Sequence, residues 1–413
     1  MKKIFTLLSA AMVAFSCSTT SSSVSVTVEN STAIDRKEEM IEVCMEAVKT
    51  KLGATEESAF VVYDAAGVEI PSQVTYDGKL IFQADVAPSS TSTYKVVVGE
   101  PQEYAPKVFG RFYPERKDDF AWENDRVAFR IYGPAAQEAN DNLYGNDVWT
   151  KSVPDLVLDY RYAMDLDPVM RAKVNELAKT DKEAAATLLK TVSFHVNHEN
   201  GMDDYNVGPT LGAGGLALME GDKIVYPYSF KDYEVLENGP IRITAKFTYH
   251  PLSIDGKDNV VETRINSMDA GTYFVKTSVS YSNLDKVTPV MAGLVMSEGA
   301  CKNAAYSKEK GFVAYEDNVR RIPADGSIYV GALFIEPAKE ADIFRFDEKD
   351  PVIAATGMTG HVALIGDYTP NTTYEYYWGA EWELSKINNF EDWVSHLDVK
   401  SQKIKSPLAV TLK

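Results

Sequence analysis

Ile241-Arg-Ile-Thr-Ala-Lys-Phe-Thr-Tyr249 is the stretch of this sequence that decides the fold. Every odd-numbered residue in it is apolar or aromatic, and every even-numbered residue is polar. Successive side chains of a β-strand point to opposite faces of a sheet, so this alternation predicts a strand with one face in the core and one in water. The stretch therefore predicts an antiparallel sheet.

Short segments of strand-like composition lie on both sides of this stretch. Gly, Asn and Asp, which favour turns, separate them. The further predicted strands are 24–28, 59–63, 80–84, 94–98, 260–265, 273–281, 328–335 and 362–365. Segment 39–51 tolerates a helix by composition, but its neighbours favour a strand. This pattern predicts an all-β protein built around a large antiparallel sandwich.

Residues 167–190 interrupt the strand pattern. Pro168 stands near a helix start, and Ala, Leu, Glu and Lys dominate up to Leu189. We expect one inserted helix here, placed over a sheet edge or at the mouth of the sandwich.

The N-terminus predicts export and a lipid anchor. Lys2 and Lys3 precede an apolar run, and Cys17 follows the small Ser16. These features are typical of a lipoprotein signal peptide over 1–17, with Cys17 as the acylated residue. The alternative is an ordinary secretory peptide that is cut within the Ser-rich tract that follows. Acidic residues do not directly follow Cys17, which favours an anchored, periplasm-facing protein whose only membrane contact is that anchor.

The mature chain is expected to contain a tether and two domains. Residues 18–23 are Ser-rich and form the tether, residues 24–100 are expected to form a small β-sandwich, and residues 106–413 the large one. Pro101 and Pro106 mark the boundary between the two domains.

Composition excludes two classes of protein. The net charge of −18 and the pI near 4.8 argue against binding to nucleic acid or to an anionic membrane through a basic surface. With Cys17 acylated, only Cys44 and Cys301 remain as free cysteines after processing, so the fold depends on its core rather than on a disulfide framework.

Residues 195–215 have the composition of a reaction site. His195 and His198, two of five histidines, precede Asp203 and Tyr205, and a Gly-rich run follows. Imidazole beside carboxylate supplies groups that exchange protons near neutrality. Tyr205 is a candidate proton donor, and glycine allows the backbone to approach a ligand closely. The alternative is that the histidines bridge loops and the acids are solvated.

No cofactor is expected, although a metal ion is an alternative for this segment. His195 and His198 with an acid offer zinc ligands, and Asp203 with Asp204 offers calcium ligands. The spacing of the two histidines is three, so the segment lacks the helical zinc motif with a spacing of four.

Charged and aromatic residues gather in three other segments. Arg116, Lys117 and Arg126 are candidates to neutralise a uronate carboxylate, and Trp122 offers a flat face for a sugar ring. Surface ion pairs and aromatic core packing are the alternatives. The predicted substrate-binding residues are Trp122, Glu123, Asp125, Asp147, Trp149, Lys151, Trp378 and Trp382, and His361 and Glu381 belong to the last of these patches.

Four segments carry a resemblance to a known family. They are FAWENDRVAFRIYG at 120–133, DYNVGPTLGAGG at 204–215 together with Asp203, YEVLENGP at 233–240 and YWGAEW at 377–382. Jointly they resemble the domain of unknown function 4861 family, which occurs among glycan-degrading Gram-negative bacteria.

The resemblance runs from about residue 36 to residue 397. It implies a galactose-mutarotase-like supersandwich and genetic company with enzymes that cut pectin-like or other uronic-acid glycans. The positions that match are Glu123, Asp125, Arg126, His198, Asp203, Tyr205 and Trp378. The family pattern often has Asp-His-Gly around His198, whereas Asn197, Glu199 and Asn200 surround it here.

The leading hypothesis is an enzyme that acts on uronate-containing oligosaccharides by β-elimination or hydrolysis. In the lyase version Arg126 neutralises the uronate, His198 abstracts a proton and Tyr205 protonates the leaving oxygen, with His195 and Asp203 beside them. This requires the three side chains to share one hollow. The alternatives are a non-catalytic envelope protein that binds sugars and a mutarotase-like sugar isomerase.

Overall fold

The computed structural model describes residues 22–297, 303–318, 323–347, 349 and 355–413. The predicted signal peptide, its acylation site Cys17 and most of the tether lie outside these residues. Within the described ranges no helix is both long and apolar enough to cross a membrane.

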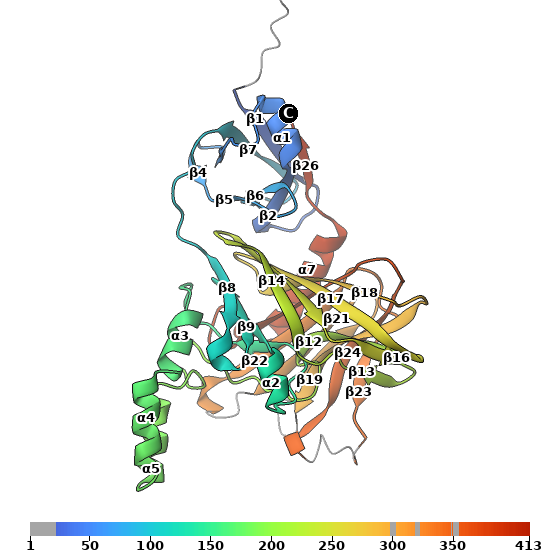
Figure 1. Ribbon diagram of the computed structural model, residues 1–413. Coiled ribbons are helices and arrows are strands. Elements are labelled where there is room, and N and C mark those ends of the chain that lie inside the picture. The colour runs from blue at the N-terminus through green and yellow to red at the C-terminus, as the bar shows by residue number, and fades with distance from the viewer. Residues whose placement is uncertain (1–21, 298–302, 319–322, 348, 350–354) are drawn as a thin grey trace, which may run out of the picture.

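A large two-layered sandwich forms the body of the molecule (Figure 1). In the described part of the chain its first layer is a nine-stranded antiparallel sheet, in which β16 (Leu252–Ile254) pairs with β17. The order of the other strands is β14 (Phe230–Gly239), β15 (Arg242–Tyr249), β17 (Lys257–Asp269), β18 (Phe274–Ser282), β25 (Tyr374–Trp382), β22 (Ser327–Phe334), β21 (Phe312–Asn318) and β20 (Ala304–Ser307).

Two smaller antiparallel sheets make the second layer. One has the order β13 (Lys223–Val225), β12 (Ala213–Glu220), β19 (Thr288–Ser297), β24 (Met358–Tyr368) and β23 (Glu340–Arg345). The other has the order β11 (Asp147–Trp149), β10 (Ala128–Ile131), β9 (Asp119–Asn124) and β8 (Val108–Tyr113). A bridge between Asn146 and Gly212 links them next to β11 and β12.

The main core lies between these layers, because the strands alternate as expected. Ile243, Ala245 and Phe247 of β15 are buried in it, which confirms the strand predicted at 241–249. Trp122 of β9 packs edge-to-face on Trp378 of β25 with the ring centroids 6.1 Å apart. The predicted all-β class is therefore confirmed.

The even-numbered residues of β15 differ from the prediction. Arg242 and Thr244 are buried rather than wet, because a second unit covers this face of the sheet. Gln73 of that unit accepts hydrogen bonds from the backbone N–H of Ile241 and Arg242, at 3.1 and 3.0 Å. The alternation therefore predicted which face of the strand is apolar, but it did not predict that the small sandwich covers the polar face.

The covering unit is a small β-sandwich with its own apolar core. One sheet has the order β26 (Ala409–Leu412), β1 (Val24–Asn30), β7 (Ser90–Val98), β3 (Phe60–Tyr63) and β4 (Glu69–Ile70). The other has the order β2 (Arg36–Cys44), β6 (Lys79–Val86) and β5 (Ser72–Val74). Segment 39–51 proves to be both strand and helix, since α1 (Met45–Leu52) follows β2 directly.

The large sandwich was expected to extend to residue 413, but the C-terminal strand β26 belongs to the small sandwich instead. β26 pairs antiparallel with β1, with Val26 opposite Leu412. It thereby satisfies the backbone groups of a strand that would otherwise be an open edge of the small sandwich. The chain thus begins and ends in the same small sandwich (Figure 1).

Several helices lie on the outside of the large sandwich. The single helix expected within 167–190 is in fact two, α4 (Pro168–Leu177) and α5 (Lys182–Lys190), which project from the body beyond α3 (Leu158–Asp165) (Figure 1). Asp181 separates the two helices, because its side chain accepts a hydrogen bond from the N–H of Ala184 and so caps the start of α5. Other helical elements in the described ranges are η1 (Pro114–Arg116), α2 (Pro134–Glu138), η2 (Pro323–Asp325) and α7 (Phe390–Lys405).

We predict that Trp378→Ala destabilises the whole large sandwich. The side chain is fully buried, and its indole N–H donates to Thr277 at 2.8 Å, so truncation leaves a cavity and removes this hydrogen bond, while the Thr277 hydroxyl still donates to Asn266. The free energy of unfolding should fall by about 3–5 kcal/mol in a denaturant titration. Tyr306→Ala, at an exposed aromatic, is the control and should change it little. Equal stability of both variants would contradict the core assignment.

Candidate active site

The outer face of the four-stranded sheet is polar where its inner face is apolar. Phe120, Phe129 and Val148 point into the main core, whereas the alternate residues of β9, β10 and β11 point away from it. On that outer face α3 and the loop 192–205 cover Trp149 and its neighbours. Charged side chains share this covered surface, so their positions are fixed by the strands beneath.

Arg130 is the centre of this surface. Its guanidinium is 4% exposed and lies 2.8 Å from Asp147, 2.8 Å from Asp203 and 3.5 Å from Asp119. Asp147 is directly opposite Arg130 in the β10–β11 register, while Asp203 comes from the loop. We refer to Asp119, Arg130, Asp147, Asp203 and His195 as the Arg130 site.

Three carboxylates share one guanidinium here, and burial disfavours their charged form. Desolvation raises the pKa of Asp119 and of Asp147 to about 6 each, although Arg130 opposes the shift. Tyrosine hydroxyls donate to both acids, Tyr162 to Asp119 at 3.1 Å and Tyr132 to Asp147 at 2.9 Å. The site therefore holds carboxyl groups that change protonation close to neutral pH, a property concentrated at functional sites.

His195 is the member of the site that reaches the surface. Its side chain is 33% exposed, and Nδ1 lies 2.7 Å from the main-chain carbonyl oxygen of Asp203 and 3.4 Å from Oδ2 of the same residue. Asp203 is in turn held by Arg130. An imidazole that donates from Nδ1 to a fixed acceptor has a defined orientation and tautomer, as proton transfer requires.

Arg116 lies at the edge of the same site. It ends η1, immediately before β9, and its positive charge acts on Asp119. The side chain is half-buried, and none of the hydrogen bonds or ion pairs found among the described residues includes it; Nη1 is buried without a partner. Arg116 is therefore a cation with donors available to an anionic ligand.

The structure brings several predicted residues together around Arg130. Asp147 and Trp149 of β11 meet His195 and Asp203 of the loop 192–205 on this face. Arg130 itself and Asp119 were missed by the sequence analysis. The signal that could have found Arg130 is a charged residue inside the apolar strand Ala128–Ile131, where burial without a partner would be costly.

Glu123 and Lys151 lie on the same face but have a structural role. Lys151 Nζ is 2.6 Å from Glu123 Oε2, and both side chains are fully buried. The other oxygen of Glu123 accepts the backbone N–H of Val157 and Leu158 at 2.7 Å each, so it fixes the start of α3. Neither group is accessible to a substrate, and the prediction that they bind one is wrong.

The four predicted sugar-stacking tryptophans are also buried. Trp122 and Trp378 pack in the main core, Trp382 donates to the carbonyl oxygen of Asp325 at 2.7 Å, and Trp149 packs on Tyr162. A ring enclosed on both faces cannot stack on a sugar, so the substrate-binding predictions for these residues are wrong. These tryptophans are therefore buried packing residues and not parts of a sugar-binding surface.

Arg126, His198 and Tyr205 do not converge. Arg126 pairs with Glu38 of the small sandwich at 2.6 Å, and it lies four strand positions from Arg130, roughly 13 Å along the chain. His198 Nε2 donates to the carbonyl oxygen of Ser193 at 2.9 Å, and Tyr205 is packed in the main core. The proposed three-residue reaction site is therefore wrong. Asp125, also predicted to bind substrate, accepts the N–H of Gly271.

The remaining predicted groups are explained by burial. His361 is fully buried, which lowers its pKa to about 3 and keeps the ring neutral. Burial raises the pKa of Glu381 to about 7. Within the described ranges no group of three or more His, Cys, Asp or Glu side chains could hold a metal ion.

Comparison with known proteins gives a family and one curated relative. The family model described as Domain of unknown function (DUF4861) matches residues 28–410. The "Uncharacterized protein P7" of Formosa agariphila is 25% identical over 405 residues, which cover 94% of this chain and 93% of the relative.

Two solved structures from Enterococcus faecalis are similar at low identity. One is a protein in glycosyl hydrolase family 38, with a TM-score of 0.49, 10% identity and coverage of 95% of this chain and 47% of the other. The second is an alpha-mannosidase, with a TM-score of 0.45, 9% identity and coverage of 95% and 46%. The chain thus spans about half the length of these structures.

We predict a pH-dependent stability that Asp119→Asn removes in part. Because the pKa of Asp119 is raised to about 6 in the folded state, the folded protein binds more protons than the unfolded chain between about pH 4 and pH 6. The stabilisation that comes from the protonated Asp119 is therefore complete below pH 4 and is lost as the pH rises through 6. From pH 4 to pH 7 the wild type should lose up to about 3 kcal/mol relative to the variant.

Denaturant titrations of both proteins across this pH range measure the difference. Parallel pH profiles for the wild type and the variant would contradict a raised pKa at Asp119.

Proposed function

Since the chain belongs to the DUF4861 family, whose name assigns no reaction, we propose from its own geometry that it processes uronic-acid-containing oligosaccharides at the Arg130 site. The observation that carries the proposal is the one-third exposed imidazole of His195, held by Asp203 at 2.7 Å beside a buried guanidinium. His195 takes the place that the sequence analysis assigned to His198.

In the lyase version Arg116 binds the uronate carboxylate. Neutralising that carboxylate makes the proton on the adjacent ring carbon, C5, more acidic. His195 accepts this proton, the C5–H electron pair forms the C4–C5 double bond, and the C4–O bond to the next sugar breaks. The imidazolium then returns the proton to the leaving oxygen, which departs as a hydroxyl group.

The hydrolytic version uses the same groups with water as the second reactant. Asp119 and Asp147 have a raised pKa of about 6 but are fully buried, so they act on this reaction only through Arg130 and Asp203, which hold His195. The two versions are separated by their products, since elimination creates an unsaturated uronate that absorbs ultraviolet light and hydrolysis does not.

We propose as well that the mature protein acts outside the cytoplasm, attached to the membrane through acylated Cys17 and facing the periplasm. The charged and apolar pattern of residues 1–17 supports this placement. Its substrate would then be a fragment of extracellular glycan.

We predict that His195→Ala lowers kcat on a uronate oligosaccharide by about 10²–10⁴-fold, the usual contribution of a general base. The substrate is chosen by screening pectic and algal glycans for ultraviolet absorbance and for new reducing ends. His250→Ala, at a histidine outside the Arg130 site, is the matched control and should keep the wild-type rate. Loss of activity in both variants or in neither argues against His195, and binding without any turnover favours a non-catalytic sugar-binding protein.

A second prediction concerns the carboxylate of the substrate. Arg116→Gln should raise KM for that oligosaccharide about tenfold, because one charge-assisted hydrogen bond is lost in the bound state. Lys117→Gln is the control, since Lys117 is exposed and pairs with Asp141 at 2.6 Å. An unchanged KM in the Arg116 variant would remove this residue from the proposal.

A further inference from the structure

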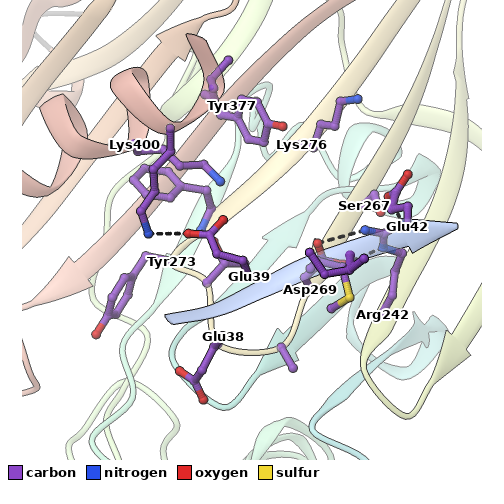
Figure 2. A pocket seen from close by; sticks show the side chains of 18 of the residues that line it. Glu38, Glu39, Glu42, Arg242, Ser267, Asp269, Tyr273, Lys276, Tyr377 and Lys400 are labelled. Atoms are coloured by element: carbon purple, nitrogen blue, oxygen red, sulfur yellow. Dashed lines mark hydrogen bonds and ion pairs between the residues drawn. The ribbon is translucent and has the colours of Figure 1, made fainter. Parts of the chain in front are cut away.

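A cleft of about 790 Å³ lies between the small sandwich and the outer face of the nine-stranded sheet, on the opposite side of the core from the Arg130 site. β2 of the small sandwich forms one wall, β15, β17, β18 and β25 form the floor, and α7 closes the far side (Figure 2). This volume is in the range of pockets that enclose small organic ligands. None of the residues of the Arg130 site lines it.

Ion pairs across the cleft fix its walls. Arg242 on the floor lies 2.6 Å from Glu42 of β2 and 2.5 Å from Asp269 of β17. Lys403 of α7 pairs with Glu39 of β2. These contacts tie the small sandwich to the sheet and to α7, so the cleft is a built feature of the fold.

The lining is basic although the protein is acidic. Nine Lys and Arg side chains line the cleft against seven Asp and Glu side chains, in a chain of net charge −18. A surface of opposite sign to the rest of the molecule concentrates anions against the overall field. The cleft is therefore suited to a ligand that carries negative charge.

Lys400 is a cation of this lining that is held by aromatic rings, and Glu39 and Asp269 are the carboxylates whose charges act on it. Its ammonium lies over the Tyr377 ring at 4.7 Å and near the Phe274 ring at 5.7 Å, and none of the ion pairs among the described residues includes it. Figure 2 places it on α7 facing the floor, beside Tyr377. Burial lowers its pKa. Aromatic rings stabilise an ammonium but leave its charge unneutralised, so an anion placed here would compensate the cost of desolvation.

The rest of the floor offers groups that recognise hydroxyls. Ser267, Ser278 and Glu375 line it, and Lys276 lies 2.8 Å from Glu375. Alternating hydroxyl, carboxylate and ammonium groups donate to and accept from the hydroxyls of a sugar ring.

We propose that this cleft is a second binding site, for a carboxylated sugar of an oligosaccharide, whose carboxylate pairs with Lys400. The site shares its ligand class with the proposed function but does not depend on the Arg130 site, and the two have separate variants. Its role is to hold an anionic glycan on the face away from the reaction.

Calorimetric titration with trigalacturonate tests the site. Lys400→Gln should weaken binding roughly tenfold, as expected when a charge-assisted hydrogen bond is lost. Lys310→Gln, at a lysine that pairs with Asp398 outside the cleft, is the control and should bind as the wild type does. The fully methyl-esterified trisaccharide, which lacks the charge, should bind the wild type as weakly as the acid binds the Lys400 variant.

The experiment also separates the two sites. Binding at the cleft should survive in the double variant Arg116→Gln, His195→Ala, where both the carboxylate contact and the turnover at the Arg130 site are lost. Because Lys400 forms no ion pair within the described part of the chain and its burial lowers its pKa, its variant should be at least as stable as the wild type in thermal unfolding. Failure of trigalacturonate to bind, equal affinity of acid and ester, or an unchanged affinity in the Lys400 variant would overturn the proposal.

Discussion

A single apolar core held between two antiparallel layers constrains the rest of this molecule. Strand side chains alternate, so each strand that buries one face in the core must present its other face outward. The outer face of the four-stranded sheet carries the Arg130 site, and that of the nine-stranded sheet floors the cleft. Both are held in position by the packing of Trp122, Phe129 and Trp378 between them.

The Arg130 site places charged groups where their burial is energetically unfavourable. Burying three carboxylates around one guanidinium costs several kcal/mol of desolvation per ion, and apolar residues of the same size would often be more stable. The fold nevertheless retains Asp119, Asp147 and Asp203 there, with Tyr132 and Tyr162 as donors. Such an arrangement fits a site whose carboxyl protonation is used, because it sets pKa values near neutrality.

Local sequence predicted the strands well and the reaction site in part. The alternation at 241–249 located β15, since periodicity depends only on near neighbours. His195 and Asp203 are eight residues apart and were found as one cluster. Arg130 was missed because its partners Asp119 and Asp147 come from neighbouring strands. Arg126 was chosen instead, but its guanidinium is paired with Glu38 of the small sandwich. The tryptophans were misassigned because composition does not distinguish a buried ring from an exposed one.

By itself the sequence determined the all-β class, the positions of many strands, the acidic character and the family. The physical reason is that alternation, turn residues and charge are properties of local chain segments. Only the tertiary structure decided that β26 returns to the small sandwich, that Arg130 gathers three acids and that Lys400 faces a cleft between two aromatic rings. Those facts depend on strand order and register, which bring together residues that are distant in the sequence, 73 residues apart for Arg130 and Asp203 and several hundred for β1 and β26.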